Sequence, residues 1–205
     1  MRTRAKIGLD FFSIKSGMRS FMLLIAILNL SLIQAQINDE SVENQKKPSE
    51  IWHVKALHPE GFTMDVKAID KNGVRYDVKA FEEAGQRYIM DIKAFVGDKK
   101  LPVKVLVSEE EYKPVCAIGE NGKTYLLKAI DKNGNFMHVK GIRNSDHIVN
   151  IKAVDKQGKI YGVKAISASG KLNDVKGIKM YDKQLEVTLH GVAVHAHVVA
   201  LPQIQ

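Results

Sequence analysis

The sequence predicts an all-β protein, an antiparallel meander of about 12–13 short strands closed as a flattened barrel or a two-layer sandwich. Three observations predict this class. A phrase of the form Val-Lys-Ala returns about every twelve residues, apolar and polar side chains alternate within each copy, and glycine-containing turn signals separate most copies. Each copy is too short for a helical hairpin and therefore predicts one strand of about eight residues.

The N-terminal segment, residues 1–35, is expected to be a secretory signal peptide that is not part of the fold. Its apolar run begins at Phe21, after the basic Arg19, and the small Ala35 precedes the expected cleavage point, with Met18 as an alternative start. The run is short for a membrane span, and an uncleaved N-terminal anchor is the alternative. We therefore expect an exported protein of the periplasm, the cell surface or the medium.

Removal of the expected signal peptide changes the net charge of the chain. The whole chain has 31 Lys and Arg against 23 Asp and Glu, but five of these basic residues and one acidic residue lie in residues 1–35, which leaves 26 against 22 and a net charge of +4. Such a small excess, together with export, argues against nucleic acid as a partner. Residues 36–50 are polar and predict a flexible leader. Residues 51–202 then form one β-repeat domain with a sizeable core.

The valine position of each copy, here called the valine slot, defines the repeat. Thirteen copies are recognised, with slots at Val54, Val66, Val78, Ile92, Val103, Val115, Leu127, Val139, Ile151, Val163, Val175, Val187 and Val198. Between them lie turn signals such as Asp-Lys-Asn-Gly at 70–73 and 131–134. Aspartate suits the first position of a type I turn, and glycine accepts the positive φ that follows, which predicts three-residue hairpin loops.

The direction of neighbouring copies follows from the charges beside the valine slots. A parallel solenoid would stack equivalent lysines into a ladder of like charges. An antiparallel meander instead places Lys55 opposite Asp65. The same register places Lys67 opposite Asp77, Lys79 opposite Asp91, Lys164 opposite Asp174, and Lys176 opposite Glu186. Opposite charges across neighbouring strands favour the meander.

The two faces of the predicted sheet differ in character. Alanines alternate with large apolar residues on the core face, whose bulky members are Trp52, Met64, Tyr76, Met90, Tyr125, Met137 and Tyr161. The other face has the Lys and Asp rows and is expected to face water.

Lysines without an acidic partner in this register are the candidate binding residues. They are Lys93, Lys104, Lys128, Lys140 and Lys152, and their expected partners are Pro102, Pro114, His138, Asn150 and Gly162. Such a row of cations suits an acidic polysaccharide or another component of the cell envelope. The alternative is that the lysine rows only pair with aspartates and keep the face soluble, since exposed ion pairs contribute about 0–1 kcal/mol each.

A second candidate site lies near the C-terminus. His195 and His197 are two residues apart on a predicted strand and point to the same side, and a turn at His190-Gly191 would bring Glu186 opposite His195. Two imidazoles and a carboxylate can bind zinc and leave an open position, which suggests a metal-binding protein or a metal-dependent hydrolase as an alternative function. Decoration of the last strand by histidines is the simpler interpretation.

The rest of the sequence offers little for catalysis. No nucleophile motif, paired carboxylates or phosphate-binding glycine loop is present, so we expect a non-catalytic protein without a required cofactor. Cys116 is the only cysteine, which excludes an internal disulfide. It occupies a position that other copies fill with lysine, either as a reactive thiol or as a plain replacement.

The phrases "DVKAID" and "HVKGI" and the ending "GVAVHAHVVALP" resemble those of small secreted β-repeat proteins from Bacteroidetes-type Gram-negative bacteria. This resemblance covers most of residues 51–202 and implies export and the repeat, but it transfers no activity and no functional residue. We therefore expect an exported binding protein, with a purely structural envelope protein as a further alternative.

Overall fold

The computed structural model describes residues 49–82, 88–145, 147–179 and 187–203. They belong to one compact unit, Pro48–Gln205. The predicted signal peptide and all but the end of the predicted leader lie outside the described residues. The first strand begins at Glu50, one residue inside that leader. In the described part of the chain, no helix has the length and apolar character needed to span a membrane.

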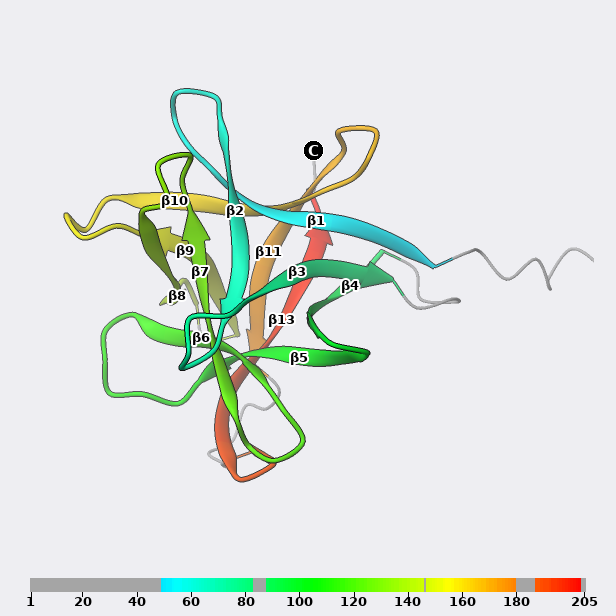
Figure 1. Ribbon diagram of the computed structural model, residues 1–205, viewed down its shortest axis with the longest axis vertical. Helices are drawn as coiled ribbons and strands as arrows, with labels where there is room; N and C mark the ends of the chain where they lie inside the picture. The colour runs from blue at the N-terminus through cyan, green and yellow to red at the C-terminus, as the bar shows by residue number, and fades with distance from the viewer. Residues whose placement is uncertain (1–48, 83–87, 146, 180–186, 204–205) are drawn as a thin grey trace, which may run out of the picture. The chain divides into compact units, whose positions relative to one another are not determined.

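The described residues form thirteen strands and no helices, which confirms the all-β prediction (Figure 1). The first six are β1 (Glu50–Leu57), β2 (Thr63–Ile69), β3 (Arg75–Glu82), β4 (Met90–Val96), β5 (Lys99–Leu106) and β6 (Lys113–Ile118). The next seven are β7 (Thr124–Ile130), β8 (Phe136–Arg143), β9 (Ile148–Val154), β10 (Ile160–Ile166), β11 (Leu172–Lys179), β12 (Val187–Leu189) and β13 (Val192–Pro202). Each coincides with one copy of the repeat.

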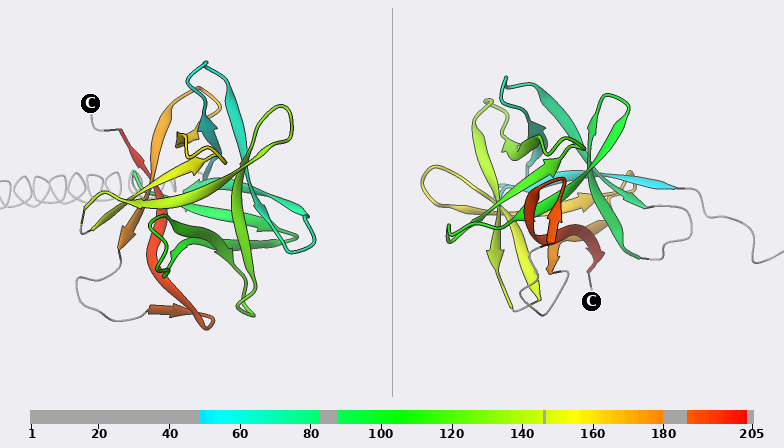
Figure 2. Two further views of the ribbon diagram at one scale, coloured as in Figure 1. Left: turned by 90° about the vertical axis from the view of Figure 1, so that its left-hand side faces the viewer. Right: turned by 90° about the horizontal axis from the view of Figure 1, so that it is seen from below.

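The turns have the predicted geometry, and their hairpins project from the sheet in several directions (Figure 2). In the β2–β3 loop, the Gly73 amide donates to the Asp70 carbonyl over 3.0 Å, and Gly73 has a φ of 82°. Asp70 Oδ1 also accepts the amides of Asn72 and Val74, both at 2.9 Å. The loops that begin at Asp131 and Asp155 repeat this pattern. Aspartate therefore ties the loop together while glycine accepts the left-handed backbone.

All strand pairings in the described residues are antiparallel, and the thirteen strands form one sheet that rings around on itself. The predicted antiparallel meander is confirmed, and the sheet closes on itself through groups of three strands. Twelve strands form four clusters of three, in which each strand pairs with both others. Cluster I is β1–β2–β3, cluster II is β6–β7–β8, cluster III is β9–β10–β11, and cluster IV is β4–β5–β13.

Each strand uses its remaining edge to pair with a strand of another cluster. The six linking pairs are β1–β10, β2–β7, β3–β4, β5–β6, β8–β9 and β11–β13. The strands of the last pair, β11 and β13, lie side by side in Figure 1. Every two clusters are linked once, which is the connectivity of a tetrahedron. Twelve equivalent repeats therefore have twelve equivalent positions. No strand of the twelve has a free edge over its central residues, which protects the sheet from pairing with other chains.

The register within hairpins agrees with the predicted charge pairs. Lys55 lies opposite Asp65, Lys67 opposite Asp77, and Lys164 opposite Asp174. Two other predicted pairs are wrong. Lys79 lies opposite Lys93 and His53, and Lys176 lies opposite Asn150 and Val199. Strand β3 pairs with its next neighbour β4 as expected, but the register is shifted by two residues, so that Asp91 lies opposite Phe81. At Lys176, β11 pairs instead with its cluster partner β9 and its linking strand β13.

The thirteenth repeat copy, around Val187, is not part of the four clusters. Its strand β12 is three residues long and pairs with β13 alone. The β12–β13 turn at His190 and Gly191 lies against the β6–β7 loop, where a side chain at Gly122 would meet the His190 carbonyl oxygen at 2.7 Å. This copy therefore extends the last strand rather than adding a layer to the sheet.

The core lies where valine slots of one strand meet small residues of the linked strand. Val54 faces Ala165, for example, and Ala56 faces Val163. The predicted core residues Met64, Met90, Tyr125, Met137 and Tyr161 are buried, and Trp52 and Tyr76 pack half-buried against them. The small residue at this position of most strands, two residues after the valine slot, lets the strands approach closely enough for the valines to fill the centre.

Candidate functional site

The outer face of each cluster has a ring of six side chains, two from each strand, that flank the valine slots. In cluster I this ring alternates charge: Lys55 and Asp65 are paired, as are Lys67 and Asp77, and Lys79 Nζ lies 3.7 Å from Asp77. The lysine rows predicted from the sequence are therefore separate rings, and the charge balance differs from ring to ring.

The five candidate lysines are distributed over three rings. Lys93 and Lys104 belong to cluster IV, Lys128 and Lys140 to cluster II, and Lys152 to cluster III. The structure thus brings Lys128, Lys140 and Lys152 together. It places Lys93 and Lys104 in a separate ring, where they interact with residues of that ring.

Cluster IV holds its two lysines in a polar network with the C-terminal strand. Asp91 accepts a hydrogen bond from His197 Nε2 at 2.9 Å and forms an ion pair with Lys93 at 2.8 Å. The hydrogen bond from His197 makes the largest contribution to lowering the pKa of Asp91 from its ordinary value, and the interaction with Lys93 lowers it further. Lys104 contacts His197 Nδ1, and its pKa is lowered by burial and by the charge of Lys93. The two contacts suit a His197 ring that donates from Nε2 to Asp91 and accepts at Nδ1 from Lys104.

This network bears directly on the predicted metal site. His197 already uses both ring nitrogens, whereas His195 lies at a β-bulge where β13 shifts register against β5. Burial and the charges of Lys113, Lys179 and Arg143 lower the pKa of His195. No three His, Cys, Asp or Glu side chains among the described residues are placed to hold a metal. Glu186, the third predicted ligand, lies outside them.

A continuous row of basic side chains crosses clusters I, II and III, and we call it the cationic band: Lys67, Lys128, His138, Lys140 and Lys152. Its order follows from the register. Lys128 lies opposite both Lys67 and His138, which are on the two strands that flank β7, and Lys140 lies opposite Lys152 across the β8–β9 link. Burial and the charges of Lys128 and Lys140 lower the pKa of His138.

The cationic band is compensated unevenly. Lys67 pairs with Asp77, and Lys140 Nζ lies 2.6 Å from Glu110 Oε2 in the β5–β6 loop. Lys128 and Lys152 form no ion pair with any carboxylate in the part of the chain that the structure describes. The ring of cluster II has no acidic residue, because its members are Pro114, Cys116, Leu126, Lys128, His138 and Lys140. Cluster II is therefore the one of the four described rings that has no acidic member of its own.

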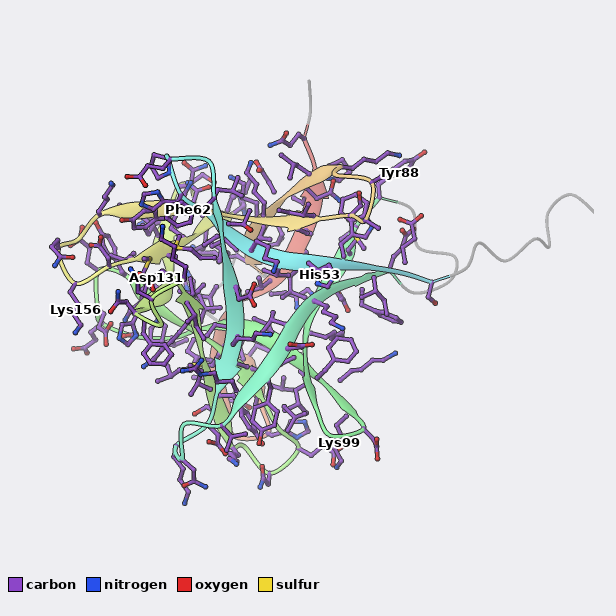
Figure 3. The ribbon with its side chains drawn as sticks, turned by 45° about the horizontal axis from the view of Figure 1, so that its top comes forward. His53, Phe62, Tyr88, Lys99, Asp131 and Lys156 are labelled. Atoms are coloured by element: carbon purple, nitrogen blue, oxygen red, sulfur yellow. The ribbon has the colours of Figure 1, made fainter. Side chains whose placement is uncertain are left out.

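A pocket that sequence reasoning missed lies beside this band, and we call it the loop pocket. It has a volume of about 580 Å³ and forms where the β1–β2, β7–β8 and β9–β10 loops meet. Figure 3 shows one labelled residue from each loop, Phe62, Asp131 and Lys156, on the same side of the domain. The rings of Phe62 and His58 stack at 4.1 Å between centroids, and His58 stacks on Tyr161 at 5.3 Å.

One sequence signal could have pointed to this pocket. The first loop reads His-Pro-Glu-Gly-Phe at 58–62, where the other two loops of the pocket read Asp-Lys-Asn-Gly-Asn and Asp-Lys-Gln-Gly-Lys. His58 and Phe62, the first and last residues of this loop, are thus aromatic rings where the other two loops have polar residues. The spacing of the loops along the chain, however, says nothing about which three of them meet.

The family of the chain is defined by its β-repeat domain. A family model described as a family of unknown function, DUF7486, matches residues 49–201, which is nearly the whole of the unit that contains the four clusters. The chain belongs to DUF7486. Searches of curated proteins and of solved structures found no match to it. The DUF7486 domain therefore has to be interpreted through its own geometry.

Cys116 of this DUF7486 domain is expected to be unreactive in the folded protein. It is 2% exposed on β6, and burial raises the pKa of its thiol to about 12. Because the thiolate is the reacting species, Ellman's reagent should label the protein only after denaturation. Rapid labelling of the native protein would instead restore the hypothesis of a reactive thiol.

Proposed function

We propose that this protein is an exported, non-catalytic protein that binds an anionic glycan, or another anionic component of the cell envelope, through the cationic band. The observation that carries this proposal is the ring of cluster II, which has two lysines and no acidic member. The signal-like N-terminal sequence supports export, and the absence of a catalytic motif in the sequence supports binding rather than catalysis.

The physical reason is the way the linking strands juxtapose lysines. Equivalent lysines lie directly opposite each other in four of the six links, and like charges in such positions repel. At the β1–β10 link, Asp65 and Asp174 neutralise the two lysines. At the β8–β9 link only Glu110 does so, from an exposed loop position. A bound anion would supply the missing negative charge there.

Lys128 adds an aromatic neighbour to this surface. Its ammonium lies 5.2 Å from the centroid of the Phe136 ring, which Arg75 at the start of β3 also approaches at 5.1 Å. Phe136 is 37% exposed. A partly exposed ring between two cations suits a ligand that has both anionic groups and apolar ring faces, as many acidic sugars do.

The test is retention on an immobilised acidic polysaccharide with elution by a salt gradient. Replacing Lys128, Lys140 and Lys152 together by glutamine should weaken binding by at least about tenfold, because three contacts of roughly 0.5–1 kcal/mol each are lost. The control replaces the exposed lysines Lys71, Lys99 and Lys171 by glutamine, which removes the same net charge elsewhere. Equal loss in the two variants would overturn the proposal, as would a wild-type protein that is not retained. The latter result would favour a purely structural envelope protein.

A further inference from the structure

The walls of the loop pocket combine apolar rings with anchored carboxylates. Phe62, His58 and Tyr161 form its aromatic side. Asp131 and Asp155 lie on the other loops, and Asn135 and Gln157 add amides. A pocket of this volume with an apolar side and a few convergent polar groups has the size and chemistry of a small-molecule or single-sugar site.

The two carboxylates are held in place by their own loops. Asp131 accepts backbone amides through Oδ1 and the side-chain amide of Asn135 through Oδ2 at 2.9 Å. Asp155 accepts backbone amides through Oδ1 and the Tyr161 hydroxyl through Oδ2, also at 2.9 Å. Loop hydrogen bonds lower the pKa of both groups, so both are ionised at neutral pH. The pocket therefore presents two fixed carboxylates next to its aromatic side, and the basic Lys156 is also part of its lining.

A groove that shares Asp131 with the loop pocket includes Lys67 of the cationic band. The groove is lined by Thr63, Asp65, Lys67, Arg75, Ile130, Asp131 and Lys132, so that Asp131 belongs to both the pocket and the groove. Phe136 lines the pocket and also contacts Arg75 and Lys128. At its far end the groove includes Lys67, which lies opposite Lys128. A chain molecule could thus occupy the pocket and the band at the same time.

We propose that the loop pocket binds an uncharged sugar ring, and that the ligand is a mixed glycan in which an uncharged ring lies next to an anionic one. This inference rests on the proposed function and names its substrate class. The uncharged ring packs against the aromatic side and donates hydroxyl hydrogen bonds to Asp131 and Asp155. The neighbouring anionic ring lies in the groove, near Arg75, Lys67 and Lys132.

Electrostatics gives the pocket its selectivity. A polymer in which every ring has a carboxylate would place one negative charge beside Asp131 and Asp155, and like charges at such short range repel each other. Such a polymer is expected to bind through the band alone. A polymer with alternating uncharged and anionic rings avoids that repulsion and gains the pocket contacts.

The experiment compares two probes of equal length by calorimetry at one salt concentration. Hyaluronan oligosaccharides alternate glucuronate with an uncharged amino-sugar derivative, whereas polygalacturonate oligosaccharides have a charge on every ring. The wild-type protein should bind hyaluronan oligosaccharides about tenfold more tightly, since one avoided repulsion and a few contacts amount to about 1.4 kcal/mol. Equal binding of the two probes, or preference for polygalacturonate, would overturn the inference.

The variant that tests the carboxylates is Asp131→Asn with Asp155→Asn. Asparagine keeps an oxygen that can accept the loop amides, so the turns should form. The preference should fall severalfold, mainly because polygalacturonate binds more tightly. The control, Asp98→Asn with Glu109→Gln, removes two exposed charges outside the pocket and should leave the preference unchanged. An unchanged preference in the pocket variant, or an equal change in the control, would contradict the inference.

Failure of the inference and failure of the proposed function give different results. If both probes bind equally and the Lys128, Lys140 and Lys152 triple variant loses both, the proposed function stands and the inference falls. If neither probe binds, or if the triple variant binds both as well as the wild type does, both fall.

Discussion

The Gly141→Ala protein is expected to unfold at a lower urea concentration than the wild type, by about 1–3 kcal/mol in the free energy of unfolding. A Cβ atom at Gly141 would lie 2.9 Å from a methyl group of Val105 and 2.9 Å from one of Val149. The backbone of Gly141 is outside the left-handed region, so alanine suits its conformation and only space opposes it. Gly177→Ala should show a smaller loss, because its nearest neighbours lie at 3.1–3.3 Å.

The cause is one large residue in a position that is otherwise small. The position two residues after the valine slot is alanine in nine of the twelve clustered strands, glycine at 141 and 177, and valine at 105. Val105 is fully buried and is the nearest contact of Gly177, and at Gly141 it shares that place with Val149. The two glycines thus make room for one valine from a different cluster.

A double-mutant cycle measures this compensation. Val105→Ala alone should cost about 2 kcal/mol through the cavity that it leaves, whereas Val105→Ala with Gly141→Ala should be more stable than the sum of the two changes by at least about 1 kcal/mol. Ala117→Gly, on a neighbouring strand, serves as a control that should show no such coupling with Gly141→Ala. Additive effects of the first pair would show that the core does not couple these positions.

The second large effect is expected at Asp91, whose replacement by alanine should cost about 3 kcal/mol. The carboxylate is the shared partner of His197 and Lys93, and its side chain is 22% exposed. Its removal leaves Lys93 and Lys104 close together without a counter-charge. Asp98→Ala, in the exposed β4–β5 turn, is the matched control and should change stability by no more than about 0.5 kcal/mol.

The same carboxylate predicts how stability varies with pH. The pKa of Asp91 is lower in the folded protein than in the unfolded chain, so its contribution is present above the unfolded value of about 4 and is lost as the pH falls below it. Urea unfolding between pH 7 and pH 2.5 should therefore show a smaller acid loss for Asp91→Asn than for the wild type. Parallel curves for the two proteins would contradict this role.

Local features of the fold could be predicted because they depend on neighbouring copies. The alternation of side chains predicts strands, and Asp and Gly at fixed places predict the hairpin loops. Lys55 and Asp65 are only ten residues apart, so one tight turn determines that they face each other. The pattern therefore identified strands, turns and the antiparallel direction correctly.

The links between clusters could not be predicted because the copies are nearly equivalent. Lys55 lies opposite Lys164 and Lys67 lies opposite Lys128, although nothing in the sequence distinguishes these lysine pairs from other pairs of equivalent lysines. For the same reason the predicted partner of Lys176 was wrong, whereas that of Lys79 was wrong because β3 and β4 pair in a register shifted by two residues. The candidate site could likewise be predicted only in part. Lys128, Lys140 and Lys152 come together, whereas Lys93 and Lys104 lie in the network of Asp91.

By itself, the sequence determined the strands, their turns, their direction and the two chemically different faces, since each of these follows from the preferences of a residue and its near neighbours. Only the tertiary structure decided which strands link, that Gly141 and Gly177 surround Val105, and that loops some hundred residues apart enclose a pocket beside Lys128. These features depend on how side-chain volumes fill a common centre, and a repeating sequence satisfies that requirement for one arrangement only after all twelve strands are placed.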